Sequence, residues 1–146
     1  MTHEEAREFI KQHISQRGNH TPEVTDRLVR YWWGLLNIAV FYGKLKKPKI
    51  LEIHRMRGCW GSAETASTKR ERKNGIKHVH IQMNETFVTR RMFLDILVHE
   101  MVHAWEHQYH TVMGHGKRFF AWKNRIKRTV GLGLTKMASE KEYLNG

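Results

Sequence analysis

The stretch that decides the fold is Met92-Phe93-Leu94-Asp95-Ile96-Leu97-Val98-His99-Glu100-Met101-Val102-His103-Ala104-Trp105. Its apolar residues recur at the three- and four-residue intervals that place side chains on one face of an α-helix. Together with Phe87 and Val88, the pattern predicts one long helix that begins after a cap at Asn84 or Thr86. Such a helix belongs in the core, where polar imidazoles are costly unless they have a partner.

Three further helices are predicted around the long one. Thr2 begins a capping box for an amphipathic helix over residues 2–18. Thr21 caps a second, strongly hydrophobic helix that continues to about residue 43. A basic amphipathic helix covers residues 119–130, after a chain break at Gly114-His115-Gly116.

Between the second helix and the long helix, the pattern changes to strands. Residues 50–56 favour a strand, and residues 57–62 favour a turn into another strand. Asn74-Gly75 predicts a hairpin turn that leads into an alternating strand at residues 76–83. The sequence therefore predicts an α+β fold, a helical domain with a small antiparallel sheet.

The composition favours one soluble domain. The chain has 146 residues, 40% of them hydrophobic, which suits a single domain over residues 1–146. The charged N-terminus lacks a signal peptide, and the longest apolar stretch falls short of the ~20 residues of a membrane span. We expect a cytoplasmic monomer with no membrane contact, which associates with DNA or the nucleoid if it binds nucleic acid. Its single cysteine excludes an internal disulfide and a four-cysteine zinc ribbon.

The segment His99-Glu100-Met101-Val102-His103 has the spacing of a zinc site. Residues four apart lie one turn up the same helix face, so both imidazoles can bind one cation, while Glu100 projects beside them. Zinc with three protein ligands keeps a position for water and lowers the pKa of that water to near 7. A neighbouring carboxylate can take the proton and pass it to a leaving amine.

The third ligand has to come from outside this segment. His107 would lie about 12 Å from His99 along a straight helix, too far for both to bind one ion through bonds of ~2.1 Å. His115 stands between two glycines that let the backbone turn back. We favour His115, with His110 and Glu106 as alternatives.

The chain resembles the SprT-like (Spartan-type) zinc metalloproteases over roughly residues 20–130. The resemblance rests on three segments: His99-Glu100-Met101-Val102-His103-Ala104-Trp105; Gly114-His115-Gly116 with Phe119; and Arg55-Met56-Arg57-Gly58-Cys59-Trp60-Gly61-Ser62 followed by Ile81-Gln82-Met83-Asn84. It implies a zincin-like fold with a small sheet beside the cleft. It also implies that His99, His103 and His115 bind Zn²⁺ and that Glu100 is the general base.

The family also implies a substrate class. Several members cleave proteins bound to or crosslinked on DNA, and many carry a cysteine-rich zinc ribbon after the protease domain. With one cysteine in the chain, we expect a minimal protease domain without a C-terminal ribbon. The sequence therefore predicts a zinc-dependent endopeptidase that acts on DNA-associated proteins. The alternative is a nucleic-acid-binding module with a structural zinc and no protease activity.

Several other residues are candidates for smaller roles. An exposed edge strand near Trp60 and Gly61 can hold an extended substrate by main-chain pairing. Tyr109, Arg55 or Arg57 can supply a donor to the oxyanion of the reaction. His78 and His80 share one strand face, and we interpret them as part of an exposed polar surface rather than a metal pair.

The chain is strongly basic, with 26 Lys and Arg against 14 Asp and Glu and a formal net charge of +12. This excess favours polyanionic partners and predicts sequence-independent contact with single- or double-stranded DNA through phosphate groups. The basic residues form three clusters: Lys44, Lys46, Lys47 and Lys49; Lys69, Arg70, Arg72 and Lys73; and Lys117, Arg118, Lys123, Arg125, Lys127 and Arg128.

Overall fold

The computed structural model describes residues 1–15, 23–110 and 113–135. Helices and strands are mixed along the chain, and the α+β class predicted from the sequence is confirmed. The elements are α1 (His3–Ser15), α2 (Asp26–Phe41), β1 (Ile50–His54), β2 (Gly61–Thr65), α3 (Lys69–Lys73), β3 (Val79–Asn84), α4 (Arg90–Tyr109), α5 (Lys117–Phe120) and α6 (Lys123–Val130).

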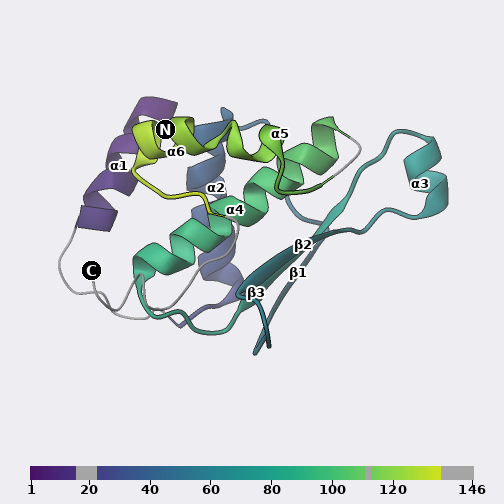
Figure 1. The fold of residues 1–146 in the computed structure, drawn as a ribbon, viewed down its shortest axis with the longest axis horizontal. Helices are drawn as coiled ribbons and strands as arrows, with labels where there is room; N and C mark the ends of the chain where they lie inside the picture. The colour runs from purple at the N-terminus through teal and green to yellow at the C-terminus, as the bar shows by residue number, and fades with distance from the viewer. Residues whose placement is uncertain (16–22, 111–112, 136–146) are drawn as a thin grey trace.

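Helix α4 is the central element of the fold (Figure 1). It packs against β2 and β3 on one side and against α2 and α5 elsewhere, so most of its side chains are buried. The predicted caps Asn84 and Thr86 are both wrong, because Thr89 caps this helix by accepting a hydrogen bond from the backbone N–H of Met92 at 3.1 Å. Phe87 lies in the core before the helix begins.

The sheet has the strand order β1-β3-β2. Strand β3 pairs parallel to β1 and antiparallel to β2, so the sheet is mixed rather than purely antiparallel as predicted. Strands β1 and β2 run in opposite directions, so a strand between them must be parallel to one of the two. Val79, Ile81 and Met83 make β3 the most buried strand, which suits it to this central place.

The predicted hairpin at Asn74-Gly75 is replaced by the end of a short helix. Thr68 and Glu71 form a capping box, with the Thr68 hydroxyl accepting from the Glu71 N–H at 3.1 Å and the Glu71 carboxylate accepting from the Thr68 N–H at 3.0 Å. This box begins α3, and Asn74 caps its C-terminal end. Gly75 has φ +73°, a conformation that both a hairpin turn and a helix end require.

Helices α1 and α6 pack against α2, and α5 packs against α4. The capping box of Thr2 is present and begins α1. Helix α2 is capped by Thr25, and the predicted cap Thr21 lies outside the described residues. The predicted helix over residues 119–130 is divided into α5 and α6, and Gly131 ends α6 in a left-handed conformation. No helix in the described part of the chain is long and apolar enough to cross a membrane.

Candidate metal centre

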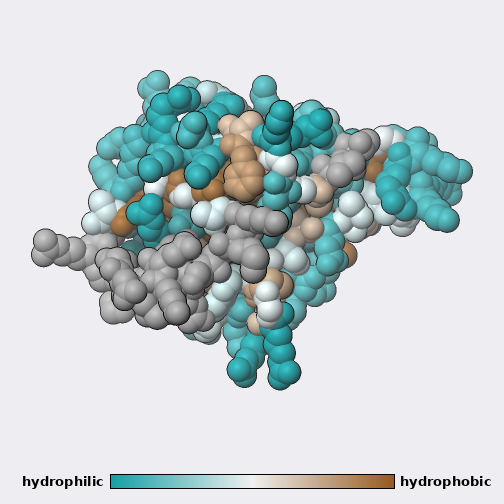
Figure 2. Space-filling view, viewed as in Figure 1, coloured by the Kyte–Doolittle hydropathy of each residue, from teal (hydrophilic) through white to brown (hydrophobic). Residues whose placement is uncertain are grey.

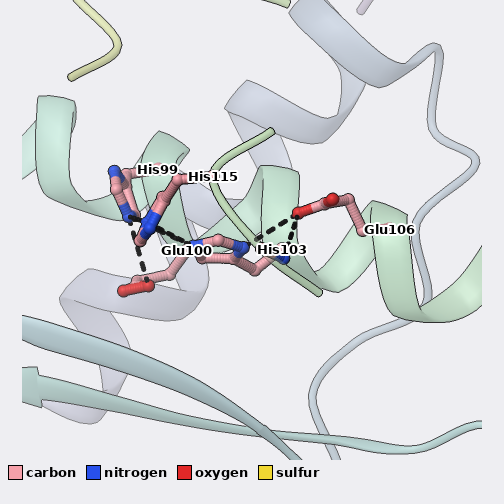
Figure 3. Close-up of polar contacts among 6 residues, drawn as sticks. His99, Glu100, His103, Glu106 and His115 are labelled. Carbon is pink, nitrogen blue, oxygen red and sulfur yellow. Dashed lines mark hydrogen bonds and ion pairs between the residues drawn. The ribbon is translucent and has the colours of Figure 1, made fainter. Parts of the chain in front are cut away.

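Three imidazoles meet beside helix α4 (Figure 3). His99 and His103 lie one turn apart on that helix, and His115 reaches them from the turn before α5. The Nε2 atom of His103 is 3.2 Å from that of His99 and 3.1 Å from that of His115, and the third pair, His99 and His115, is also 3.1 Å apart. The turn carries His115 back to the helix as the sequence predicted, but it does not require glycine: Gly116 has φ −94°, and a Cβ atom at Gly114 or Gly116 would meet no atom within 4 Å.

This arrangement fits a metal ion. The point in the plane of the three Nε2 atoms that is equally far from all of them lies about 1.8 Å from each. This distance is slightly less than a Zn–N bond of ~2.0–2.1 Å. A cation of that size therefore fits just outside the plane, with its opposite side free of these ligands. Within the described residues, His99, His103 and His115 form a group that can hold a metal ion.

The other ring nitrogens of the two helical histidines have partners of their own. Nδ1 of His103 lies 3.0 Å from the Oε1 atom of Glu106. His99 forms a hydrogen bond with the backbone of Thr135. Partners of this kind fix the orientation of an imidazole, so that its second nitrogen is presented to the site.

Burial keeps the helical imidazoles neutral. Desolvation, with a smaller effect of the neighbouring imidazoles, lowers the pKa of both His99 and His103 to about 4. A histidine has to be unprotonated to bind a metal ion. At neutral pH these two side chains are therefore already in the form that a metal requires.

Phe119 supports all three rings. Its ring is stacked on His103 with centroids 4.7 Å apart, and it meets His99 at 4.8 Å and His115 at 4.9 Å edge to face. In the sequence, Phe119 was noted only beside Gly114-His115-Gly116 and at the start of a predicted helix, and His115 lies outside any helix, so no helical spacing indicated this contact. It is fully buried.

Glu100 lies at the edge of the group. Its Oε1 atom is 4.0 Å from Nε2 of His99, and its side chain is buried against the edge strand β2. Burial raises the pKa of Glu100 to about 8. A cation held by the three imidazoles would favour the ionised form of this carboxyl group, which is the form that acts as a base.

The comparison with known families agrees with this geometry. The model of the SprT-like family matches residues 30–140, which is most of the chain. The chain belongs to the SprT-like family. No curated protein is similar enough to this SprT-like chain to count as a relative.

The alternative third ligands of the SprT-like domain have other contacts. Glu106 binds the outer nitrogen of His103 instead of facing the metal position. The ring of His110 packs edge to face on Trp105, with centroids 4.9 Å apart. The sequence analysis ruled out His107 as the third ligand because of its distance from His99. In the structure His107 is buried, and it does not belong to the metal-binding group found among the described residues.

The structure places most of the residues for which the sequence suggested smaller roles. The Tyr109 hydroxyl donates to the backbone carbonyl of Lys44 at 3.1 Å, so it is engaged at the far end of α4. Arg55 and Trp60 line a separate cavity of about 650 Å³. His78 and His80 lie beside different carboxylates, with His78 3.0 Å from Glu71.

Two of the basic clusters meet near the C-terminal end of α4. Lys49, of the first cluster, lies 3.5 Å from Glu71 of helix α3, which carries the second. Gln108, in the last turn of α4, donates to the carbonyl of Lys44 at 3.1 Å. The third cluster lies on α5 and α6. Figure 2 shows hydrophilic side chains over α3 and along the edge of the molecule over α5 and α6.

Proposed function

We propose that this SprT-like protein is a zinc-dependent endopeptidase. The observation that carries the proposal is the convergence of three Nε2 atoms within 3.2 Å of one another, with the Glu100 carboxylate beside them. Three nitrogen ligands and an open fourth position are typical of catalytic zinc, whereas structural zinc sites have four protein ligands.

The roles of the residues follow from their places. His99, His103 and His115 would hold the zinc ion, which would supply Lewis acidity and lower the pKa of a bound water to near 7. Glu100 would take a proton from the attacking water and deliver it to the amine that leaves. Its position suits this role, because its Oε1 atom is 4.0 Å from Nε2 of His99, beside the place that the three imidazoles surround.

The edge strand β2 supports a peptide substrate. It is one of the two outer strands of the sheet, the one that packs against α4, and Gly61 at its start lies against Glu100. An extended segment that pairs with such an edge is held by main-chain hydrogen bonds. Recognition of this kind reads few side chains, so we expect broad cleavage specificity.

The first test is Glu100→Gln. The amide keeps the size of the side chain but cannot act as a base, so cleavage of a basic DNA-binding protein should fall by a factor of about 10² or more. Zinc content should stay at the level of the unaltered protein. Glu8→Gln, an exposed change on α1, is the matched control. Full activity in Glu100→Gln would remove this residue from the mechanism.

We also propose that the substrates are DNA-associated proteins. The net charge of +12 and the three clusters support contact with phosphate groups. The double variant Lys123→Glu/Lys127→Glu should weaken binding of single- and double-stranded oligonucleotides and reduce the slope of affinity against salt by about two. The control Lys11→Glu/Arg27→Glu makes the same charge change on α1 and α2. An affinity independent of salt would contradict the proposal.

A further inference from the structure

Glu106 is a buried acid that the proposed reaction does not use. It lies on α4 one turn after His103, and its side chain is almost fully buried. Its Oε1 atom is 3.0 Å from Nδ1 of His103 and 3.4 Å from the backbone nitrogen of Gly114 (Figure 3). One carboxylate oxygen therefore contacts a ligand on the helix and the turn that carries another ligand.

The contact with His103 determines which nitrogen faces the metal. A neutral imidazole carries one N–H, and the other nitrogen has the lone pair that binds a metal. The Oε1 atom of Glu106 already accepts from the N–H of Gly114, so this oxygen acts as an acceptor and favours the form of His103 with the proton on Nδ1. That form leaves Nε2, which points to His99 and His115, free to bind.

The contact between Glu106 and Gly114 holds the turn that carries the third histidine, His115. Gly114 directly precedes His115, which is exposed and belongs to no helix or strand. The N–H of Gly114 donates to the same oxygen that holds His103. The two ligands are thereby fixed relative to each other before any ion arrives.

We propose that Glu106 is a positioning residue of the metal centre, which fixes the tautomer of His103 and docks the turn that carries His115. His99 is oriented by a backbone group instead, so Glu106 is the side chain through which this preorganisation can be tested. The link to catalysis rests on the proposed function, but the effect on metal binding does not.

The test compares Glu106→Ala with Glu106→Gln. Alanine removes the acceptor for both N–H groups, so zinc affinity, measured by competition with a chromophoric chelator, should fall by a factor of about 10 to 100. Glutamine can keep an oxygen at the same place and should restore most of the affinity. In the metal-free protein, nitrogen NMR should show His103 with its proton on Nδ1, and Glu106→Ala should shift the proton toward Nε2.

Glu71 on α3 provides a matched control. Its carboxylate lies 3.0 Å from Nε2 of His78 and accepts from the backbone N–H of Thr68 at 3.0 Å, so it makes the same two kinds of contact away from the group of His99, His103 and His115. Glu71→Ala and Glu71→Gln should leave zinc affinity and the His103 tautomer unchanged. Unfolding measurements on the metal-free variants separate a loss of folding from a loss of the site.

The outcomes distinguish the two proposals. Glu106→Ala with unchanged zinc affinity and tautomer would overturn the positioning role, as would a Glu106→Gln variant as weak as Glu106→Ala. An unaltered protein that binds zinc but cleaves no protein would contradict the endopeptidase proposal alone.

Discussion

At the scale of single residues, the place of Glu100 depends on the absence of a side chain at Gly61. A Cβ atom added there would lie 3.0 Å from Cγ2 of Ile96, 3.2 Å from Cγ of Glu100 and 3.3 Å from the carbonyl oxygen of Gln82. The last of these atoms is backbone and cannot rotate away. Ile96, Glu100 or the edge strand must therefore move if a methyl group is introduced.

We predict that Gly61→Ala lowers kcat by a factor of about 10 to 100, because small displacements of a catalytic group have effects of this size. Zinc affinity should stay unchanged, since no histidine ligand touches this glycine. Gly34→Ala is the control, because a Cβ at Gly34 meets no atom within 4 Å. Steady-state kinetics and zinc titration on both variants make the comparison, and a Gly61→Ala enzyme with an unaltered kcat would show that Glu100 tolerates the change.

The sequence predicted the residues whose roles follow from local spacing. His99 and His103 are one helical turn apart, and His115 lies between glycines. The roles of Glu106 and Gly61 were not predicted, because they depend on contacts across space. Glu106 entered the sequence analysis only as an alternative ligand, since a carboxylate near a metal motif gives no sign of which nitrogen it will contact.

At the scale of the elements, the sequence predicted that helix α4 exists but not the residue at which it begins. Its apolar periodicity shows the helix plainly, but Asn84, Thr86 and Thr89 are all residue types that cap helices. Asn84 is the last residue of β3, and its side chain donates to the carbonyl of Met56. The choice among equivalent caps is made by the packing of the sheet, which the sequence pattern does not contain.

Thr89→Ala should therefore lower the free energy of unfolding by about 1 to 2 kcal/mol, the usual effect of losing a capping side chain. Thr86→Ala, at the exposed position that sequence spacing also favoured, should change it by less than about 0.5 kcal/mol. Urea unfolding followed by circular dichroism measures both. An equal loss in the two variants would indicate that the helix begins earlier than the structure places it.

The mixed sheet and helix α3 are the two elements that the sequence pattern did not predict. Asn74-Gly75 suits any turn that needs a left-handed residue, so it could not distinguish a hairpin from a helix end. The capping box at Thr68 and Glu71 was the local signal for the helix. The parallel pairing of β1 with β3 has no local signal, because it arises only when β3 is placed between β1 and β2, which run in opposite directions.

At the scale of the whole molecule, the metal centre joins parts of the chain that are far apart in sequence. Helix α4 supplies two histidines, the turn before α5 supplies the third, and the segment after α6 reaches His99 through the backbone of Thr135. Phe119 then packs all three imidazoles against the core. A ligand that binds only this assembled arrangement stabilises the folded state as a whole.

Removal of zinc should therefore lower the midpoint of thermal unfolding. At free zinc about 100 times its Kd, the linkage is worth about 2.7 kcal/mol, or roughly 5–10 °C for a domain of this size. His115→Ala should abolish the difference between zinc-loaded and chelator-treated protein. Because His115 is exposed, the same change should leave the metal-free midpoint nearly unaltered.

His110→Ala is the matched variant for this measurement, since His110 was the other histidine that sequence reasoning allowed as third ligand. Its ring packs on Trp105 and takes no part in the histidine group, so the zinc-dependent shift should persist while the midpoint falls in both states. Scanning calorimetry with and without chelator resolves the two effects. A shift that survives His115→Ala and disappears in His110→Ala would place the third ligand at position 110 and require the turn before α5 to rearrange around the ion.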